Sequence, residues 1–402
     1  MIIKRTPPRY PRQGPSCLLV LFVIFGIGVA MFVMVNSDEV RDAIIPTPTP
    51  QPTRSATEYA LLADLSEGDG ETLKAVEFYE NAIRLDATKP EFFVRLINLL
   101  VDTRQPERAL EVAEQATVLA PDNDGIWTAA AAAYIANGER LLDLGDPTGA
   151  ALQYAQAVQA AEKAIDINPQ NSDAYAYAAA GLVLPNDPSR FVRAQEMADL
   201  AVTIDPENPL ARYYMAVTLV YQGYYEAARE NYQLGLQYDP DNPDLYYGLG
   251  YNFFGTGNIP EAILSFEQAI AADPEYAAAY DGLAYMYLQL GEDPTAEQNA
   301  LEAVRLNPNV ARAHGRLGEA YFRQFNYPNA IESLQRAVSL YGEATDLNAR
   351  FFLMLGNAYI RDSLDNCPQA VPLFEQVIAV SLSWREDAAA GIEECRRAVP
   401  GG

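Results

Sequence analysis

The residue types that most often carry out enzyme chemistry are sparse in this chain. His314 is its single histidine, although nucleophilic catalysis by serine or cysteine normally needs a histidine base. The sequence has no phosphate-binding loop, no dinucleotide-binding fingerprint and no HExxH zinc motif. The stretches PDNDG and DPDNPD resemble calcium loops but lack the distal glutamate that such a loop needs. We therefore expect no catalytic residue, no metal ion and no cofactor.

The charge balance narrows the class of partner. The 402 residues carry a formal net charge of −26, and a chain this acidic repels phosphate backbones. Nucleic acid is therefore not an expected partner. Three cysteines and one histidine do not form a disulfide-dense scaffold, and they make a zinc site of several such ligands improbable.

The N-terminal part differs in composition from the rest. Residues 1–16 form a basic tail without an acidic residue, and residues 17–36 form an apolar stretch whose first nineteen residues carry no charge. A helix of that length crosses a hydrocarbon core of about 30 Å. The basic tail before the stretch, with Asp38 and Glu39 after it, predicts a single-pass helix with a cytoplasmic N-terminus and an extracytoplasmic remainder. The inverted topology is the alternative.

A cleaved signal peptide is a second interpretation of the same stretch. Its apolar region would be about 7–15 residues long and would end in a small-x-small site, which MFVMVNSDEV does not offer. Residues 37–57 are rich in proline and threonine, a composition that favours an extended linker. We expect an uncleaved anchor followed by a spacer.

From Tyr59 onward the chain is repetitive. Asp-Pro and Asn-Pro pairs end successive apolar segments, and four of these prolines are spaced by 34 residues: Pro206, Pro240, Pro274 and Pro308. Apolar residues within each unit follow helical spacing, whereas no segment shows sustained two-residue alternation. Each unit is therefore expected to be helix, turn, helix, without strands.

Small residues recur in register when each unit is numbered so that its proline is residue 32. Position 20 is alanine in eight units: Ala75, Ala109, Ala157, Ala194, Ala228, Ala262, Ala296 and Ala330. Small side chains there, and at positions 8 and 27, let two helices approach closely, while large residues at positions 4 and 11 fill the gaps. This pattern resembles the tetratricopeptide repeat family over roughly residues 56–384. Arg212 and His314 depart from it at position 4, where an aromatic residue is usual, and we expect His314 to be a packing residue.

The resemblance implies an all-α fold, a right-handed superhelical solenoid of helix-turn-helix repeats preceded by one N-terminal transmembrane helix. About nine units are expected, at residues 56–89, 90–123, 124–171, 172–208, 209–242, 243–276, 277–310, 311–344 and 349–384. A C-terminal capping helix and tail at 385–402 would follow, because an open solenoid needs a polar end to stay soluble. The third unit carries about fourteen extra residues, NGERLLDLGDPTGA, which should lengthen its two helices.

Consecutive helices of this architecture run antiparallel. Cys367 and Cys395 are about equally far from the turn near Leu382, so they should lie level with each other across the last hairpin. An extracytoplasmic location would permit their oxidation. A disulfide that staples the cap is one hypothesis, and two free thiols are the other.

The family's superhelix presents a concave face lined by the first helix of each unit. The outward positions of units five to eight give the predicted partner-binding groove: Tyr213, Val217, Tyr221, Tyr247, Tyr251, Phe254, Asp281, Tyr285, Arg312, Arg316 and Arg323. Such rings could hold an extended peptide or a helix. The alternative is that a tight superhelix buries them against one another. Basic residues at the C-terminal end of this set, continued by Arg350 and Arg361, suggest a partner with an acidic segment.

The expected function is that of a non-catalytic protein–protein interaction scaffold or adaptor, anchored in the membrane and binding a peptide or protein segment in this groove. The alternative is a cell-envelope glycan-binding or assembly factor that uses the same tyrosines. An enzyme would need a catalytic domain, and only about twenty residues follow the repeats.

Overall fold

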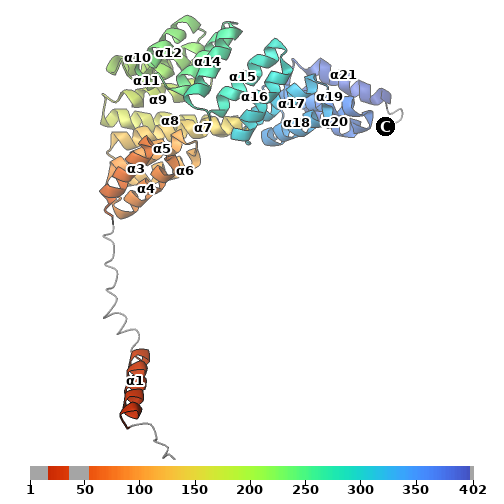
Figure 1. Cartoon of the computed structure of the whole chain (residues 1–402). Coiled ribbons are helices and arrows are strands. Elements are labelled where there is room, and N and C mark those ends of the chain that lie inside the picture. The colour runs from red at the N-terminus through yellow and green to blue at the C-terminus, as the bar shows by residue number, and fades with distance from the viewer. Residues whose placement is uncertain (1–16, 36–53, 399–402) are drawn as a thin grey trace, which may run out of the picture. The chain divides into compact units, whose positions relative to one another are not determined.

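The structure is a computed structural model that describes residues 17–35 and 54–398 (Figure 1). The basic tail and residues 36–53, most of the predicted linker, lie outside the described residues, as do residues 399–402. The chain divides into two units between Ser55 and Ala56, and each is described by itself. The described residues contain helices and no β-strand, so the predicted all-α fold is confirmed.

The first unit contains one described helix, α1 (Cys17–Val35). Residues 18–35 are exposed, and the window Leu18–Val35 has a mean hydropathy of 3.0. Among the described residues, α1 is the one helix long and apolar enough to cross a membrane. Its length and composition make it a candidate membrane span.

The second unit is a solenoid of helix pairs, coloured from orange to blue in Figure 1. The first helices of the pairs are α3 (Ala56–Gly68), α5 (Pro90–Asp102), α7 (Asp124–Asp143), α9 (Ser172–Val183), α11 (Pro209–Tyr221), α13 (Pro243–Gly255), α15 (Ala277–Leu290), α17 (Ala311–Arg323) and α19 (Ala349–Asp362). The second helices are α4 (Thr72–Leu85), α6 (Pro106–Leu119), α8 (Pro147–Ile167), α10 (Phe191–Ile204), α12 (Tyr225–Tyr238), α14 (Ile259–Ala272), α16 (Asp293–Leu306), α18 (Tyr327–Tyr341) and α20 (Cys367–Val380). A last helix, α21 (Arg385–Ala398), closes the C-terminal end, and short 3-10 turns precede α10 and α20.

The Asp-Pro and Asn-Pro breaks carry the signals that end one helix and begin the next. Four first helices begin with an asparagine cap whose side-chain oxygen accepts from a backbone N–H of the first turn: Asn123, Asn171, Asn208 and Asn242. Proline then opens α5, α11 and α13, where its missing N–H costs nothing. The repeat boundary is therefore set by local chemistry.

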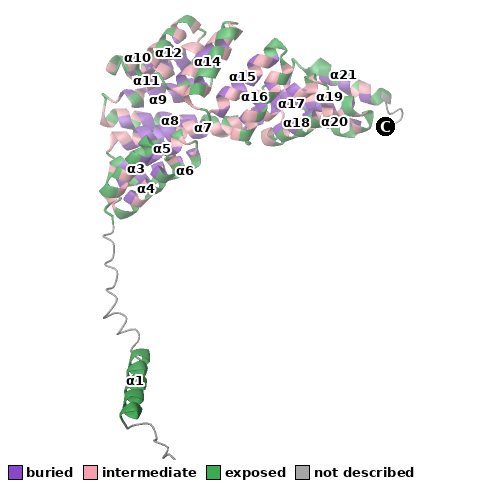
Figure 2. Ribbon diagram, in the orientation of Figure 1, coloured by how far each residue is buried: buried purple, intermediate pink, exposed green. Residues whose placement is uncertain are grey.

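The alanine column at position 20 explains the close packing of each pair. All eight of its members are fully buried in the solenoid. Large side chains fill the spaces beside them, and Tyr79, Tyr154, Phe266 and Phe374 are among the largest fully buried residues. Figure 2 shows this buried material running along the middle of the solenoid, where neighbouring helices face one another.

Position 4 has a shared polar contact that explains its unusual members. The ring nitrogen of Trp127 and the hydroxyl of Tyr246 donate to the carbonyl of the proline six residues earlier, at 2.7 and 3.0 Å. Arg212 Nε donates to the Pro206 carbonyl at 3.0 Å, and His314 Nε2 lies 3.0 Å from that of Pro308. The position therefore suits any long side chain with a hydrogen-bond donor at this reach, and His314 has a structural role.

The C-terminal cap is covalently tied to the last pair. Cys367 and Cys395 form a disulfide with their Cα atoms 5.5 Å apart, so the first residue of α20 is joined to α21. Both cysteines are buried in the cluster that contains Phe352 and Phe374. This bond fixes α21 as one wall of the site described next.

Candidate functional site: the concave face

The tyrosines of the predicted groove contact one another on the first helices of units five to seven. The Tyr247 ring meets those of Tyr251, Tyr276 and Phe266 edge-on or tilted, with centroids 5.0, 5.5 and 5.8 Å away. Phe254 and Tyr285 meet at 5.1 Å. Tyr247, Tyr251, Phe254 and Tyr285 are half-buried. Burial raises the pKa of the Tyr247 hydroxyl well above its usual value.

The other apolar members of the predicted groove lie along α11. Tyr213 is half-buried and packs edge-on against Tyr214 at 4.9 Å. Val217 is buried, whereas Tyr221 at the end of the helix is 37% exposed. Tyr221 is therefore the most exposed ring of this aromatic stripe.

The basic members of the predicted groove are engaged in ion pairs. Asp281 is 2% exposed, and its Oδ2 lies 2.5 Å from Arg316 Nη1 and 2.7 Å from Arg312 Nε. The Arg316 guanidinium also lies 4.5 Å above the Tyr285 ring. Asp281 and Arg316 are thus buried partners of each other, and we do not assign them a direct contact with a ligand.

The remaining arginines have carboxylate partners as well. Arg323 pairs with Asp293 at 2.9 Å, and Arg350 pairs with Glu319. Arg361 Nη1 lies 3.3 Å from Glu394 Oε1. The basic character predicted for this end of the face is therefore largely neutralised within the chain.

The lengthened third unit occupies the middle of the concave face. Its α7–α8 hairpin extends beyond the other pairs, and its tip reaches units seven and eight (Figure 1). Asp143 Oδ1 lies 3.9 Å from Arg312 Nη2, and Gly145 lies directly against Tyr341. A second tie joins the α5–α6 turn to the α14–α15 turn, where Arg104 Nη2 lies 2.9 Å from Asp273 Oδ2 and stacks on Tyr276. The superhelix therefore closes on itself around its tyrosines.

Acidic side chains gather where these turns of the superhelix meet. The Glu139 side chain on the hairpin is exposed to solvent, but other parts of the superhelix lie around it. Desolvation by this surrounding protein, with the charges of Asp244 and Asp143, raises its pKa to about 8. Desolvation and the charge of Asp244 likewise raise the pKa of Asp102 to about 6. Among residues 17–35 and 54–398, no three histidine, cysteine or acidic residues form a cluster able to hold a metal ion.

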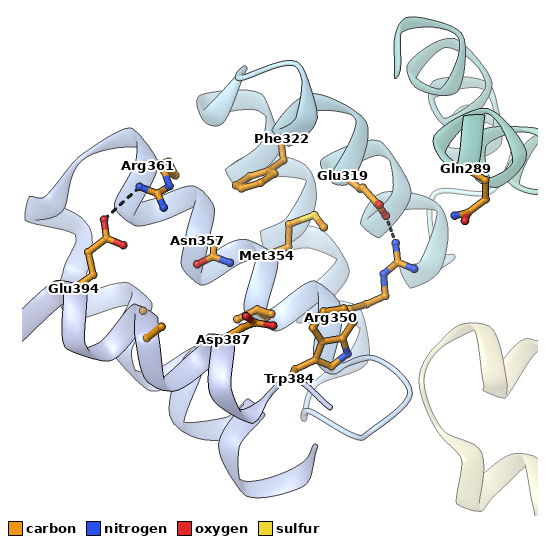
Figure 3. A pocket seen from close by; sticks show the side chains of 13 residues that line it. Gln289, Glu319, Phe322, Arg350, Met354, Asn357, Arg361, Trp384, Asp387 and Glu394 are labelled. Carbon is orange, nitrogen blue, oxygen red and sulfur yellow. Dashed lines mark hydrogen bonds and ion pairs between the residues drawn. The ribbon is translucent and has the colours of Figure 1, made fainter. Parts of the chain in front are cut away.

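A pocket of about 530 Å³ lies at the C-terminal end of the concave face, beyond the hairpin (Figure 3). Its walls come from α17, α19 and α21, with Gln289 of α15 at the edge. The volume is that of a typical small-ligand or side-chain pocket. The lining residues are Gln289, Glu319, Phe322, Arg350, Leu353, Met354, Asn357, Arg361, Trp384, Asp387, Ala390, Gly391 and Glu394.

The lining combines apolar surface with polar groups that are not used elsewhere. Trp384 and Met354 supply ring and thioether surface, and Trp384 is 37% exposed. Among residues 54–398, the Asn357 amide has no side-chain hydrogen-bond partner and Asp387 has no ion-pair partner. An amide can both donate to and accept from a peptide group, and a free carboxylate attracts a cation.

The sequence pattern predicted some of the residues that line this pocket. Arg350 and Arg361 stood in the predicted basic continuation of the groove, and both line the pocket. Asp387 and Glu394 were missed because they belong to the cap, and Trp384 was missed because it is the last residue of the predicted ninth unit, in the turn after α20 and beyond the packing positions. One of only two tryptophans in the chain, placed in a polar turn, was the available signal.

The comparisons with known proteins agree with this architecture. A family described as "TPR repeat" matches residues 218–257, and one described as "Tetratricopeptide repeat" matches residues 247–308 and 294–345. Residues 218–345 of the chain are therefore tetratricopeptide repeats. The matched residues run from α11 to α18, and the tetratricopeptide packing columns continue on both sides of them.

Several solved structures are similar to the chain. The crystal structure of the APC/C hetero-tetramer Cut9–Hcn1 is similar with a TM-score of 0.51 and 17% identity, over 92% of this chain and 79% of that chain. At this identity the likeness concerns the fold alone. Yeast Tom70 (TM-score 0.42, 16% identity, 85% of this chain and 88% of that one) is also similar. PilF of Pseudomonas aeruginosa is similar too (TM-score 0.47, 20% identity, 55% of this chain and 97% of that one). No curated protein sequence matches the chain.

Proposed function

We propose that this protein is a non-catalytic scaffold or adaptor, anchored in the membrane by α1, that binds a peptide or protein segment in the C-terminal pocket of its concave face. The pocket itself is the observation that carries the proposal. It is large enough for one or two side chains, and it combines aromatic surface with an amide and a carboxylate that have no partner within residues 54–398.

The lining indicates the chemistry of the bound segment. An apolar or aromatic side chain would pack on Trp384 and Met354, and the adjacent peptide group would bond to the Asn357 amide. A basic side chain would satisfy Asp387. The proposed ligand is therefore an apolar residue next to a lysine or arginine.

The acidic partner segment predicted from the sequence stays a prediction. It would have to displace Glu319 from Arg350 or Glu394 from Arg361, exchanging one carboxylate for another. The charge-reversal variant Asp387→Arg separates the two proposals. It weakens binding of a basic segment and strengthens binding of an acidic one.

The tyrosine-lined groove is the second candidate surface on the same face. Its residues contact one another and lie beside the α7–α8 hairpin, so a ligand there would need the hairpin to move. A glycan is the alternative ligand class, because an exposed tryptophan ring beside polar groups can also stack on a sugar.

The proposed topology has a cytoplasmic N-terminus, with the repeats outside the cytoplasm. The basic tail and the Cys367–Cys395 disulfide both support it, since disulfides persist in oxidising compartments. Protease added outside intact cells should digest the repeats and leave an N-terminal tag protected. The reverse pattern would invert the topology.

The binding proposal is tested by capture from native membranes with three stability-matched baits. One is the unchanged chain, one carries Trp384→Ala and Asn357→Ala, and one carries Tyr247→Ala, Tyr251→Ala and Tyr285→Ala. Loss of a specific protein with the first variant alone supports the pocket, and loss with the second alone moves the site to the tyrosines. Capture that resists protease treatment of the extract would favour the glycan.

A further inference from the structure

The end of the α7–α8 hairpin differs in burial from its base. None of residues 139–149 is buried, whereas most of residues 128–138 are, and Leu142 near the tip is 44% exposed. At the base, a Cβ on Gly138 of α7 would lie 2.5 Å from Cε1 of Tyr154 of α8, and Tyr154 is 1% exposed. The solenoid core therefore ends at this close contact, and residues 139–149 project beyond it. We call residues 139–149 the strap.

The start of the strap faces the helices that begin the tyrosine-lined groove. Burial is the main cause of the raised pKa of the Tyr214 and Tyr221 hydroxyls on α11, and the charge of Glu139 is the next cause. Desolvation and then the charge of Asp244, at the start of α13, raise the pKa of Glu139. Glu139 therefore faces both α11 and α13.

The tip of the strap meets the far end of the same groove. Asp143 Oδ1 lies 3.9 Å from Arg312 Nη2 of α17, and Gly145 lies against Tyr341 of α18. The strap therefore occupies the concave space that the groove faces, and a ligand in the groove would compete with it for this space. Between α11 and α17, the groove residues on α13 and α15 are Tyr247, Tyr251, Phe254, Asp281 and Tyr285.

The contact that holds the tip is weak. The side chains of Asp143 and Arg312 are 36% and 38% exposed, and such pairs contribute little to stability. Arg312 already has a closer partner, because its Nε lies 2.7 Å from Asp281 Oδ2. Desolvation raises the pKa of Asp143 although the charge of Arg312 lowers it, so the pair does not compensate this carboxylate for its lost water. The tip is therefore held mainly by the contact of Gly145 with Tyr341.

We propose that the strap is an autoinhibitory element, which closes the tyrosine-lined groove and swings out from its base at Gly138 and Tyr154 to admit an apolar peptide segment. A permanent brace would bury apolar side chains against the later units, and the strap buries none of its residues. Tyr247, Tyr251 and Tyr285 are half-buried amphipathic rings, a surface that suits an extended apolar peptide. This inference rests on the second candidate surface of the proposed function and is independent of the C-terminal pocket.

The first test measures the position of the strap by pulsed electron paramagnetic resonance. The full-length chain in lipid nanodiscs, with Cys17→Ser, carries spin labels at Leu142→Cys in the strap and Leu347→Cys in the loop before α19. Both positions are exposed, at 44% and 89%. The proposal predicts a short distance for the closed strap and a population of longer distances for the open one.

Two variants should move this population in opposite directions. Gly145→Ala pushes the tip off Tyr341 and should raise the fraction of long distances severalfold. Asp143→Asn removes a desolvated charge from the closed form and should lower that fraction. The matched control is Gly257→Ala, at another positive φ with open space around it, which should leave the distances unchanged.

The second test measures whether the strap covers the groove. Hydroxyl-radical oxidation of Tyr247, Tyr251 and Tyr285, measured by mass spectrometry, should rise severalfold in Gly145→Ala and fall in Asp143→Asn. Tyr224, 60% exposed in the turn between α11 and α12, should react equally in every variant. Tyr79, 1% exposed in the first pair, should stay unreactive wherever the solenoid is folded.

Two results would overturn the proposal. Distances that change in neither strap variant would make the hairpin a fixed part of the fold. Distances that change while the three groove tyrosines react as before would show that the strap does not close the groove. If Gly145→Ala unfolds, so that Tyr79 reacts, Asp143→Asn decides between these results. Neither measurement uses a ligand, so both are separate from the capture experiment that tests the proposed function.

Discussion

Replacing Asp281 with asparagine should destabilise the C-terminal half of the solenoid severely. The change keeps the shape of the side chain but removes the charge that faces Arg316 and Arg312, at 2.5 and 2.7 Å. Arg316 is 7% exposed, so its charge cannot turn to water when the carboxylate is lost. Removing one member of a buried pair typically costs about 3–5 kcal/mol, because the other charge stays buried without compensation.

The remaining contacts of Arg316 place the expected loss near the lower end of that range. Its guanidinium still stacks on Tyr285 and still donates to the backbone carbonyl of residue 281. We expect about 3 kcal/mol, which corresponds to a shift of about 1 M or more in the urea midpoint. The measurement is urea unfolding of residues 56–402, followed by hydrogen exchange in α15 and α17 to locate the loss.

The matched control is Glu302→Gln, which breaks an exposed pair. Glu302 and Arg305 lie 2.5 Å apart, but the arginine side chain is 64% exposed. Such pairs contribute about 0–1 kcal/mol, so this variant should unfold almost as the unchanged protein does. Equal midpoints for Asp281→Asn and Glu302→Gln would refute the buried ion pair and would return Arg312 and Arg316 to the set of accessible groove residues.

Three further perturbations test other parts of the structure. Cys395→Ser removes the disulfide between Cys367 and Cys395, which are 28 residues apart in sequence. The chain-entropy model predicts a loss of about 3–4 kcal/mol of stability, and hydrogen exchange in α21 should become faster. Unchanged exchange in α21 would contradict a stabilising role of the disulfide. Glu139→Gln removes a carboxyl whose pKa of about 8 in the folded protein is higher than in the unfolded chain. The unchanged protein should therefore lose stability as pH rises from about 4.5 to 8, and the variant should lose less. Parallel profiles of melting temperature against pH would contradict this expectation. Gly145→Ala places a Cβ 2.8 Å from Tyr341 Cδ1, whereas Gly257, which also has a positive φ, has open space around its Cα. Gly145→Ala should therefore lose about 1–3 kcal/mol more stability than Gly257→Ala and should make the hairpin more sensitive to proteolysis. Equal losses of stability would contradict the contact between the hairpin and Tyr341.

The repeat architecture was readable from the sequence because it depends on local signals. The asparagine caps, the helix-opening prolines and the alanine column each act within one unit or between adjacent units. The fourteen-residue insertion also predicted the longer helices of the third unit. The hydrogen bond at position 4 was not predicted from the sequence, because it joins the side chain to the carbonyl of the proline six residues earlier rather than to a packing neighbour.

The concave face was harder to read because its state depends on the pitch of the whole superhelix. Arg104 meets Asp273 across 169 residues of sequence, and Asp143 of the hairpin meets Arg312 of the eighth unit. The outward positions of the first helices could be listed from the repeat. The repeat does not predict whether a given tyrosine faces solvent or another turn of the same superhelix. The pocket could not be predicted for a related reason, because Trp384 lies in the turn between α20 and α21 and has no packing position in the repeat.

The proposed binding of a partner in the C-terminal pocket is tested most directly by photo-crosslinking in native membranes. A photoreactive amino acid replaces Asn357 in the full-length chain, and in the control it replaces Leu264, which is 53% exposed on α14 and does not line the pocket. We predict a discrete protein adduct from position 357 that is absent from position 264 and is lost when Trp384→Ala is added. Adducts of equal yield from both positions, or none from position 357, would contradict the pocket as the binding site.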